Sequence, residues 1–534
     1  MDTFAKDRLP PNEMWPRLHF DLPELRYPDR LNCATVLLDD AVAEGHGERP
    51  AILTATGTIT YRELLGRANR IANVLTGAGV APGNRVLLRG YNGPEMYAAW
   101  LAVMKTGAIA VTTMPMLRAP ELTAIVAKAR PAFALCDHRL QSELQAVTAE
   151  GGVGTTVTWG AGDLEARTAM ASDRFVNADI AADDVCLLAF TSGTTGQPKA
   201  CAHFHRDVLA MADVVARHLL HTAPDDVYAG SPPLGFTFGL GALLVFPLRF
   251  RAATVPIEAP APATVLAAIE RHRVTCLFTA PLAYRGLAAE LAGRDLSSLK
   301  RCVSAGEFLP KSVSDAWFEK TGIRIIDGIG ATEMIHIFIS ASGDEIRPGS
   351  TGKPLPGYRA CVLDDDGKPL PPGSTGRLAV TGPTGCRYLD DERQRDYVVD
   401  GWNVTGDLYR VDEDGYFWFV SRADDMIVSA GYNIAGLEVE WALLAHPAVR
   451  ECAVIGAADP ERGTIVKACV VLAAGRAGDI ALVKELQDFV KQRIAPYKYP
   501  RAIEFLETLP KTATGKLQRK ALRKLGVASQ FPPN

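Results

Sequence analysis

The segment Phe190-Thr-Ser-Gly-Thr-Thr-Gly-Gln-Pro-Lys199 follows the apolar stretch Val185 to Phe190, which predicts a buried strand. Its two glycines permit a backbone that surrounds an anion with N–H groups, while the side chains add hydroxyl donors and one cation. The residues that would form this cradle are Thr191, Ser192, Gly193, Thr194, Thr195, Gly196 and Lys199. A lone Gly/Ser/Thr cluster is usually a polar surface loop. The strand before it and the helix-like stretch from Arg206 to Leu219 after it favour a polyphosphate-binding loop instead.

This loop does not match the Walker A signature of P-loop NTPases. That signature places Lys directly after its last Gly and a Ser or Thr after the Lys, to hold Mg²⁺. Here Gln197 and Pro198 separate Gly196 from Lys199, and Ala200 follows the lysine. A P-loop kinase or ATPase is therefore disfavoured.

The chain before and after the loop alternates between helical and strand periodicity. We expect helices and strands in turn at Leu64–Leu75, Arg85–Leu88, Pro94–Thr106, Ala108–Thr112, Ala119–Lys128 and Ala132–Leu135, and the alternation resumes from Val185 to about Ile326. This β-α-β order predicts parallel sheets with helices on their faces.

The sequence pattern changes beyond Pro348, where short predicted β segments are separated by Gly and Pro. A second boundary falls near Ser421 to Asp425, and the tail after it reads as a compact α+β domain. We therefore expect an α/β fold with a large N-terminal domain, residues 1–423, that includes a small β-rich subdomain at about 348–420, followed by a small C-terminal domain, residues 424–534.

Composition excludes several classes of partner. The 57 Lys+Arg and 61 Asp+Glu give a formal charge of -4, so no field is present that would gather nucleic acid or anionic membrane. The most apolar stretch, Leu234 to Phe250, is broken by Gly and Pro and is too short to span a bilayer. The 10 cysteines are scattered without a Cys-x-x-Cys pair, and no apolar signal region follows Met1. We expect buried, reduced thiols in a cytoplasmic protein, and leave its oligomeric state open.

Further short motifs follow the phosphate loop in order. They are Ser304-Ala-Gly-Glu307, Asp327-Gly-Ile-Gly-Ala-Thr-Glu333, Thr405-Gly-Asp407, Arg422-Ala-Asp-Asp425 and Pro510-Lys-Thr-Ala-Thr-Gly-Lys516. Together they resemble the superfamily of adenylate-forming enzymes, which contains acyl- and aryl-CoA synthetases, peptide-synthetase adenylation domains and luciferases. The resemblance covers nearly the whole chain. It implies ATP as substrate, Mg²⁺ as metal and CoA as co-substrate.

The resemblance also assigns roles in adenylation. Thr332 would contact the α-phosphate, Glu333 would help to hold Mg²⁺, and Lys516 would be the catalytic lysine, because attack of a carboxylate on a phosphate needs its developing charge neutralised. Asp407 and Arg422 would bind the ribose. The adenine would lie against Ser304, Ala305, Gly306, Glu307, Asp327, Gly328 and Ile329, and Ile329 stands where relatives usually carry an aromatic ring.

The acid is expected to be aromatic. The run Asp327 to Phe338 and the run Ala495-Pro-Tyr-Lys-Tyr-Pro500 look like those of benzoate-CoA ligases and the related 2-aminobenzoate-CoA ligases. The acyl-binding candidates are Phe236, Gly330, Ala331, His336 and Ile337, and Phe238 is a weaker candidate, since aromatic stripes are more often core. For His336, contact with a ring substituent and a purely structural role stay equally open.

The C-terminal domain is expected to move. In the family it closes with the lysine inward and then rotates to admit the thiol. By resemblance the hinge is Asp424, and the CoA path is lined by Ser429, Ala430, Gly431 and Tyr432. The predicted enzyme is thus an ATP-dependent aryl acid:CoA ligase that forms an aryl-adenylate and then the thioester, with 2-aminobenzoate or benzoate as its acid. The alternative is an adenylation enzyme that loads another carboxylic acid onto CoA or a carrier protein.

Overall fold

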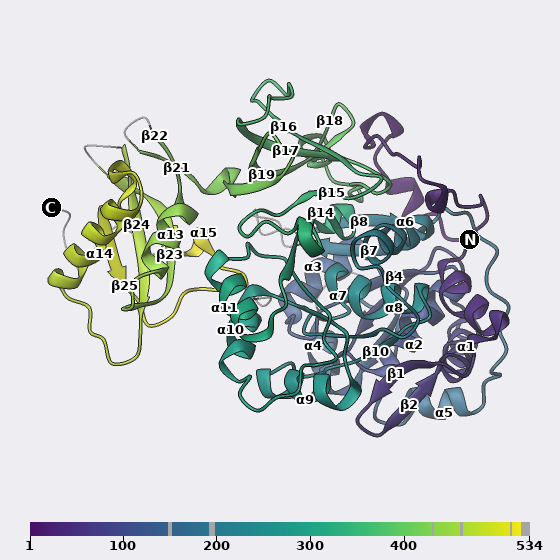
Figure 1. Cartoon of the computed structure of the whole chain (residues 1–534). Helices are drawn as coiled ribbons and strands as arrows, with labels where there is room; N and C mark the ends of the chain where they lie inside the picture. The colour runs from purple at the N-terminus through teal and green to yellow at the C-terminus, as the bar shows by residue number, and fades with distance from the viewer. Residues whose placement is uncertain (148–151, 192–197, 430–431, 460–462, 513–514, 525–534) are drawn as a thin grey trace. The chain divides into compact units, whose positions relative to one another are not determined.

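The computed structural model describes residues 1–147, 152–191, 198–429, 432–459, 463–512 and 515–524 (Figure 1). The chain forms two compact units. The first is made of Met1–Ala360 and Ala379–Val404, and the second of Cys361–Leu378 and Thr405–Asn534.

A six-stranded sheet in the first unit carries the segment that leads to the phosphate loop. Its strand order is β6 (Thr155–Trp159), β5 (Phe133–Asp137), β3 (Arg85–Arg89), β4 (Ile109–Thr113), β7 (Val185–Thr191) and β8 (Lys199–Phe204). Neighbouring strands are parallel except β8, which returns antiparallel to β7. Strands β3, β4 and β5 are buried along their whole length, which explains their apolar centres, and their polar residues stand at the strand ends. The helices that belong to this part of the chain are α2 (Pro94–Lys105), α3 (Ala119–Ala129), α4 (Gln141–Gln145) and α5 (Asp163–Ala169).

A nine-stranded sheet forms the rest of the first unit's framework. Its order is β15 (Lys353–Pro354), β14 (Ile337–Ser340), β13 (Ile325–Gly330), β12 (Arg301–Ala305), β11 (Cys276–Thr279), β9 (Val227–Gly230), β10 (Ala253–Val255), β1 (Pro50–Thr54) and β2 (Gly57–Thr60). The helices around it are α1 (Tyr61–Gly77), α6 (His205–Met211), α7 (Thr237–Leu240), α8 (Phe246–Arg249), α9 (Pro262–His272), α10 (Pro281–Ala289) and α11 (Lys311–Thr321). Strands β9 to β13 are parallel, so the carboxyl ends of β12 and β13, which carry two of the predicted motifs, lie side by side.

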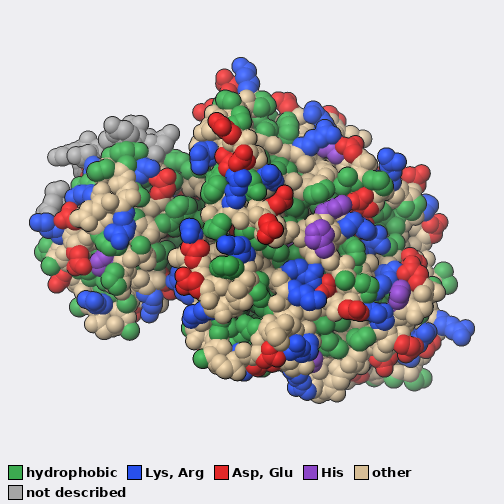
Figure 2. Space-filling view, viewed as in Figure 1, with side chains coloured by type: hydrophobic (Ala, Val, Ile, Leu, Met, Phe, Trp, Pro, Cys, Tyr) green, Lys and Arg blue, Asp and Glu red, His purple; other side chains and the backbone are tan. Residues whose placement is uncertain are grey.

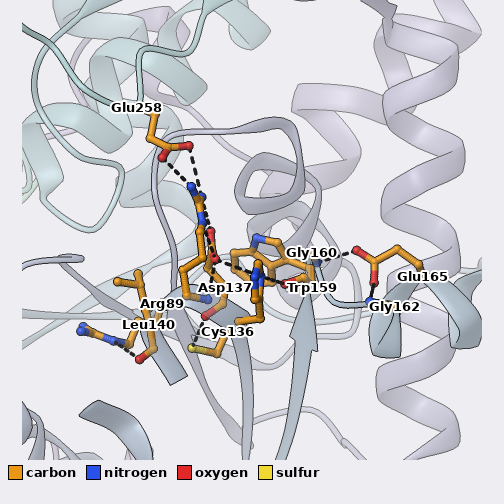
Figure 3. A network of polar contacts seen from close by, with 11 residues as sticks. Arg89, Cys136, Asp137, Leu140, Trp159, Gly160, Gly162, Glu165 and Glu258 are labelled. Atoms are coloured by element: carbon orange, nitrogen blue, oxygen red, sulfur yellow. Dashed lines mark hydrogen bonds and ion pairs between the residues drawn. The ribbon is translucent and has the colours of Figure 1, made fainter. Parts of the chain in front are cut away.

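Arg139 joins the two sheets of the first unit (Figure 3). Its guanidinium lies 2.6 Å from Asp137 Oδ2 at the end of β5 and 2.6 Å from Glu258 Oε1, in the segment after β10. Both contacts are charge-assisted hydrogen bonds, and Asp137 is buried. The Arg139 and Glu258 side chains are 45% and 48% exposed, so this bridge links the two sheets at the protein surface.

The rest of the chain contains a five-stranded sheet and the α+β tail. The sheet has the order β16 (Arg359–Leu363), β17 (Thr375–Thr381), β19 (Trp402–Val411) and β18 (Val398–Val399), with β20 (Phe417–Arg422) paired to β19. In the second unit, a hairpin of β21 (Met426–Ser429) and β22 (Tyr432–Ala435) precedes the sheet β23 (Val449–Asp459), β24 (Gly463–Leu472) and β25 (Ala502–Phe505). The apolar faces of α13 (Gly436–Leu444) and α14 (Ile480–Arg493) pack on this sheet (Figure 1), and α15 (Arg519–Lys524) follows.

The fold class is the predicted one, since the first unit is parallel α/β and the tail is α+β. The predicted boundary between the N-terminal domain, residues 1–423, and the mobile C-terminal domain, residues 424–534, stays a prediction. The apolar stretch Leu234 to Phe250 is interior, as expected, and forms α7, a π-helical segment at Gly241–Val245, and α8. Nine cysteines are buried, whereas Cys361 is only partly buried.

Acidic and basic side chains are interspersed over the face of the molecule shown in Figure 2, in keeping with the small formal charge. Within the described ranges, no helix combines the length and the apolar character that a membrane crossing requires.

Candidate functional site

The β7–β8 hairpin delivers the two ends of the phosphate loop. Thr191 ends β7 and pairs in register with Lys199, which begins β8. The loop residues that the sequence singles out between them, Ser192 to Gly196, lie outside the described residues. The antiparallel return therefore places the predicted phosphate cation directly opposite the first hydroxyl of the loop.

Lys199 belongs to a chain of three polar side chains. Its ammonium lies 3.0 Å from the hydroxyl of Tyr388 and 4.6 Å from the centre of that ring. The same hydroxyl donates a short hydrogen bond to Glu333 Oε1. Burial, followed by the charge of Glu333, holds the pKa of Tyr388 far above its usual value, so the phenol stays protonated and remains a donor. Tyr388 thus holds a cation and a carboxylate together in an interior position.

The turn that carries Glu333 is anchored to its surroundings through the backbone. His203 of β8 contacts the carbonyl of Thr332 at 2.8 Å, and the hydroxyl of Thr384 donates to the carbonyl of Met334 at 2.9 Å. The next residue, Ile335, has φ 64°, which is strained for a β-branched side chain. The Thr332–Met334 turn is therefore held in a fixed conformation, with Thr332 and Glu333 both buried.

Two polar side chains at the carboxyl ends of β12 and β13 have buried atoms without a partner. Ser304 and Asp327 are paired residues of neighbouring parallel strands. The Ser304 hydroxyl and Asp327 Oδ1 find no hydrogen-bond partner among the described residues. Burial raises the pKa of Asp327 to about 8, opposed in part by the backbone N–H of Gly328. Unpaired polar groups at this edge of a parallel sheet are what a bound ligand satisfies.

The remaining residues predicted to flank the adenine occupy the same edge. Ala305 ends β12 and is buried, whereas Gly306, with φ 91°, and Glu307 are exposed. Gly328 is buried and Ile329 is partly buried on β13. The structure therefore brings the Ser304–Glu307 and Asp327–Ile329 motifs together, as expected from their order.

His336 lies among aromatic rings just beyond the strained residue. Its ring centre is 4.7 Å from that of Phe246, edge-on, and 5.6 Å from that of Phe238. Its Nε2 is 3.4 Å from the carbonyl of Phe238, and its Nδ1 has no partner in the part of the chain that the structure describes. Burial lowers the pKa of His336 to about 3, so the imidazole is neutral.

The other acyl candidates differ in burial. Ile337 is buried, Phe236 and Ala331 are partly buried, and Gly330 is exposed at the end of β13. A Cβ on Gly330 would lie 2.9 Å from the backbone of His336, so only glycine allows the two segments to approach this closely. Phe238 is 8% exposed and packs against Phe278, which agrees with the expectation that it is mainly core.

In the second unit, Asp407 and Arg422 form one ion pair. They are register partners on β19 and β20, and the guanidinium lies 2.9 Å from Asp407 Oδ1. The carboxylate is largely buried, whereas 45% of the arginine side chain is exposed. The two residues assigned to the ribose are therefore adjacent, with the arginine reaching toward solvent.

Lys516, also in the second unit, stands on a tight turn. Its backbone N–H donates to Thr512 Oγ1 at 3.0 Å, and Thr512 N–H donates to the carbonyl of Lys516 at 2.6 Å. Gly515, with φ 86°, provides the left-handed residue of the turn. Helix α15 follows three residues later, so the lysine is presented from a short, hydrogen-bonded element.

Helix α15 is connected to the segment that contains the predicted hinge. Arg519 makes two hydrogen bonds, of 2.7 and 2.9 Å, to the buried carboxylate of Glu440, and lies 3.8 Å from Asp425. Arg523 contacts Asp425 Oδ1 at 2.6 Å and the carbonyl of Asp424 at 3.1 Å. The Asp424 side chain is exposed. We call these four side chains, Asp425, Glu440, Arg519 and Arg523, the α15 clamp.

Of the predicted CoA path, only part lies within the described residues. The hydroxyl of Ser429 donates to the carbonyl of Thr464 at 2.7 Å and is buried. Tyr432 begins β22. Ala430 and Gly431 fall outside the described ranges.

The sequence interpretation missed Tyr388. It follows β17 in the stretch Cys386-Arg-Tyr-Leu, and its backbone pairs with Cys201 of β8. The adjacent Arg387 is fully buried and ion-paired with Asp207 at 2.8 Å. A buried ion pair beside a tyrosine has no signature in one sequence, because Arg and Tyr are both common at surfaces.

Comparisons with known proteins identify the family of the chain. The model of the AMP-binding enzyme family matches residues 39–387, and that of the AMP-binding enzyme C-terminal domain matches residues 438–516. The chain is 35% identical over 517 residues to a benzoate–CoA ligase of Thauera aromatica, covering 94% of this chain and 97% of that protein. It is 34% identical to the mitochondrial acyl-coenzyme A synthetase ACSM3 of Mus musculus, over 87% of this chain and 84% of that protein. The crystal structure of the anthranilate CoA ligase AuaEII, in complex with anthranoyl-AMP, superposes with a TM-score of 0.89 at 34% identity, covering 95% of this chain and 99% of that one.

Proposed function

The chain belongs to the AMP-binding enzyme family and is an AMP-forming acid–CoA ligase, and we propose that the acid it activates is aromatic, either 2-aminobenzoate or benzoate. ATP and CoA are the co-substrates that this class of enzyme uses. The acceptor is CoA, so the alternative of loading a carrier protein is not favoured.

The observation that carries the aromatic assignment is the environment of His336. The segment that follows the Gly-rich end of β13 is buried against the rings of Phe238 and Phe246. Aromatic rings prefer edge-to-face and offset contacts, and this cluster offers them to a planar acid. Because the imidazole is neutral, it supplies no countercharge for a second carboxylate. A monocarboxylic aromatic acid therefore fits better than a dicarboxylic one.

The same histidine supports 2-aminobenzoate over benzoate. Its Nδ1 is buried without a partner in the described structure, and an ortho amino group is a donor that would satisfy it. A site built to pair a substrate N–H discriminates against an analogue that lacks it. This choice also agrees with the anthranilate ligase among the structural neighbours.

We further propose that Glu333 holds Mg²⁺. A buried carboxylate beside Lys199 and the phenol of Tyr388 suits a hard cation that prefers oxygen ligands and binds together with phosphates. When bound, the metal would neutralise charge on the phosphates of ATP. Thr332, on the same turn, would donate to the α-phosphate, while Lys199 would bind the β- and γ-phosphates together with the loop residues Thr191 to Gly196.

The nucleoside and the lysine complete the proposed assignment. Ser304 to Glu307 and Asp327 to Ile329 would bind the adenine, and Asp407 with Arg422 would bind the ribose. Lys516 would neutralise the carboxylate and the α-phosphate during adenylation. Asp424 would be the hinge of a mobile C-terminal domain, and residues Ser429 to Tyr432 would line the CoA path.

The cellular setting is proposed from the cysteines. All ten are free thiols, which suits a reducing cytoplasm, and activation as a CoA thioester is the entry step expected for degradation of an aromatic acid.

A panel of acids tests the proposal. Pyrophosphate release and CoA thioester formation are measured with 2-aminobenzoate, benzoate, 4-aminobenzoate, phenylacetate and hexanoate. We expect 2-aminobenzoate or benzoate to have the highest kcat/KM, and His336→Phe to lower selectivity for 2-aminobenzoate over benzoate by about tenfold. A preference for hexanoate would overturn the aromatic assignment, whereas equal selectivity in His336→Phe would remove His336 from recognition of the amino group.

A further inference from the structure

Two cysteines and a histidine that are distant in the sequence meet inside the first unit, apart from the residues assigned to ATP. Cys33 lies at the start of the helical segment before Thr35–Asp39, Cys186 lies on β7, and His205 begins α6. The two sulfurs and a ring nitrogen all lie within 4.8 Å of one another. All three side chains are fully buried.

The nitrogen that faces the sulfurs presents a lone pair. His205 Nδ1 accepts the backbone N–H of Cys33 at 3.2 Å and lies 3.1 Å from Cys33 Sγ. A nitrogen that accepts a backbone N–H is unprotonated, which is the form of imidazole that binds metals, and a metal bond would replace this 3.2 Å hydrogen bond at the single lone pair of Nδ1. His205 Nε2 has no hydrogen-bond partner among the described residues.

The three ligand atoms are of the kind that a soft cation requires, and binding would draw them slightly closer than their present spacing of up to 4.8 Å. Metal–sulfur bonds of about 2.3 Å and metal–nitrogen bonds of about 2.0–2.1 Å bring such ligands to within about 4 Å of one another. Thiolate and imidazole ligands select Zn²⁺ and Cu⁺ over Mg²⁺, which takes oxygen. Asp207, whose charge acts on Cys186, is paired with Arg387 at 2.8 Å and adds no uncompensated charge.

We propose that Cys33, Cys186 and His205 form a binding site for one thiophilic d10 cation, either Zn²⁺ or Cu⁺. Two thiolates balance the charge of Zn²⁺, which favours zinc in a buried position. Three ligands without a fourth favour Cu⁺, because structural zinc sites almost always have four. The two ions share the same ligand chemistry, and the experiment distinguishes them.

The position of the site in the fold gives it a structural role. Val185 pairs with Phe204 at one end of the β7–β8 hairpin, and Thr191 pairs with Lys199 at the other. Cys186 and His205 stand at the first of these ends. A bound ion would therefore tie the N-terminal helical segment to the base of the hairpin whose opposite end carries the phosphate loop.

Metal content tests the proposal on the full chain. The protein is produced in medium supplemented with zinc or with copper, purified under reducing conditions without chelator, and measured by inductively coupled plasma mass spectrometry. We expect one ion per chain in one of the two arms. Cys33→Ser and Cys186→Ser should each reduce it to background, whereas Cys276→Ser and Cys302→Ser should retain it. The last two are matched controls, because both cysteines are buried on the adjacent strands β11 and β12.

A second measurement covers the case in which a cysteine variant does not fold. Unaltered protein is unfolded, refolded with Co²⁺ in place of zinc, and examined for the near-ultraviolet absorption of a thiolate–cobalt bond. Absorption at one Co²⁺ per chain that Zn²⁺ or Cu⁺ abolishes supports the site. Absence of bound metal in both arms together with absence of this absorption would overturn it, as would metal retained at the same level in both variants.

Discussion

The two ends of the proposed ATP site within the first unit differ in whether their polar groups are already hydrogen-bonded. At the phosphate end, Lys199, Tyr388 and Glu333 are already connected by hydrogen bonds. At the adenine end, the Ser304 hydroxyl and Asp327 Oδ1 have no partner in the described structure. Both ends present buried polar atoms, so the difference does not follow from burial alone.

The difference follows from charge. Glu333 is buried and Lys199 is partly buried, and an unpaired charge in such a position costs far more free energy than an unpaired hydroxyl or a protonated carboxyl. Charged groups that await phosphates and a metal must therefore be paired inside the protein, whereas neutral groups that await an adenine can stay unpaired. Tyr388 supplies that pairing at the phosphate end, and the raised pKa of Asp327 keeps the adenine end uncharged near neutral pH.

The largest effect is expected outside both ends, at Lys516. Lys516→Ala should lower acyl-adenylate formation by about 10²–10³-fold, because charge that develops in the transition state loses its countercharge. ATP binding should change little. Pyrophosphate release with isothermal titration of ATP measures both, and Lys524→Ala, at the end of α15, is the control. Undiminished adenylation would remove Lys516 from the reaction.

At the phosphate end, Glu333→Gln should lower adenylation by about 10²-fold and raise the Mg²⁺ concentration needed for half-maximal rate. The amide keeps the shape of the side chain but loses the charge. Initial rates over a Mg²⁺ series measure the effect, with the exposed Glu319→Gln as control. An unchanged Mg²⁺ response would show that Glu333 does not hold the metal.

Tyr388→Phe tests whether the pairing itself matters. We expect about a tenfold loss of kcat with altered Mg²⁺ dependence, since a hydrogen bond to a charged group contributes about 1.5–3 kcal/mol. Tyr284→Phe is the matched control, because it removes a buried phenol that donates to the backbone carbonyls of Leu277 and Val303. If both variants lose thermal stability but only Tyr388→Phe changes its Mg²⁺ dependence, the result supports a specific role of Tyr388 in pairing the charges of the phosphate end. Identical kinetics in the two would contradict it.

The smallest effect is expected at the adenine end, in the pH dependence of stability. Because burial raises the pKa of Asp327 to about 8, the folded protein holds a proton that the unfolded chain releases near its ordinary pKa of about 4. The stabilisation is complete at acid pH and is lost as the pH rises through about 8. Asp327→Asn should therefore show a smaller fall in Tm between about pH 5 and about pH 8 than the unaltered chain.

Differential scanning fluorimetry without ligand measures this difference, with Ser304→Ala as a second variant at the same end. Ser304→Ala should leave the pH profile unchanged, since a hydroxyl does not titrate in this range. Parallel pH profiles for Asp327→Asn and the unaltered chain would show that the carboxyl is ionised at neutral pH, and the contrast between the two ends would fail.

The sequence predicted much of this arrangement because its elements are locally specified. Buried strands such as β3 and β4 have short apolar runs at their centres, and the order of motifs identifies the family that the comparisons show. The juxtaposition of Ser304 and Asp327 follows from two motifs at the carboxyl ends of neighbouring parallel strands.

Other features depend on contacts between distant residues, which periodicity does not encode. Tyr388 is 55 residues from Glu333 and 189 from Lys199, so one sequence gives no sign that they meet. The compact units exchange at Ala360 and Cys361, at Leu378 and Ala379, and at Val404 and Thr405 inside the continuous strand β19, and composition carries no sign of these crossings. The positive φ of Ile335 could not be predicted from the sequence either, since isoleucine is an unfavourable residue for that conformation.

The α15 clamp has a mechanical consequence. Asp425 is joined to Arg519 and Arg523, and Arg519 is joined in turn to Glu440. These contacts brace the start of β21, the helix α13 and the helix that follows the lysine turn against one another. If the backbone rotates at the exposed residue Asp424, Lys516 would therefore rotate together with these braced elements as one rigid body. The backbone dihedral angles that change would then lie at or before Asp424.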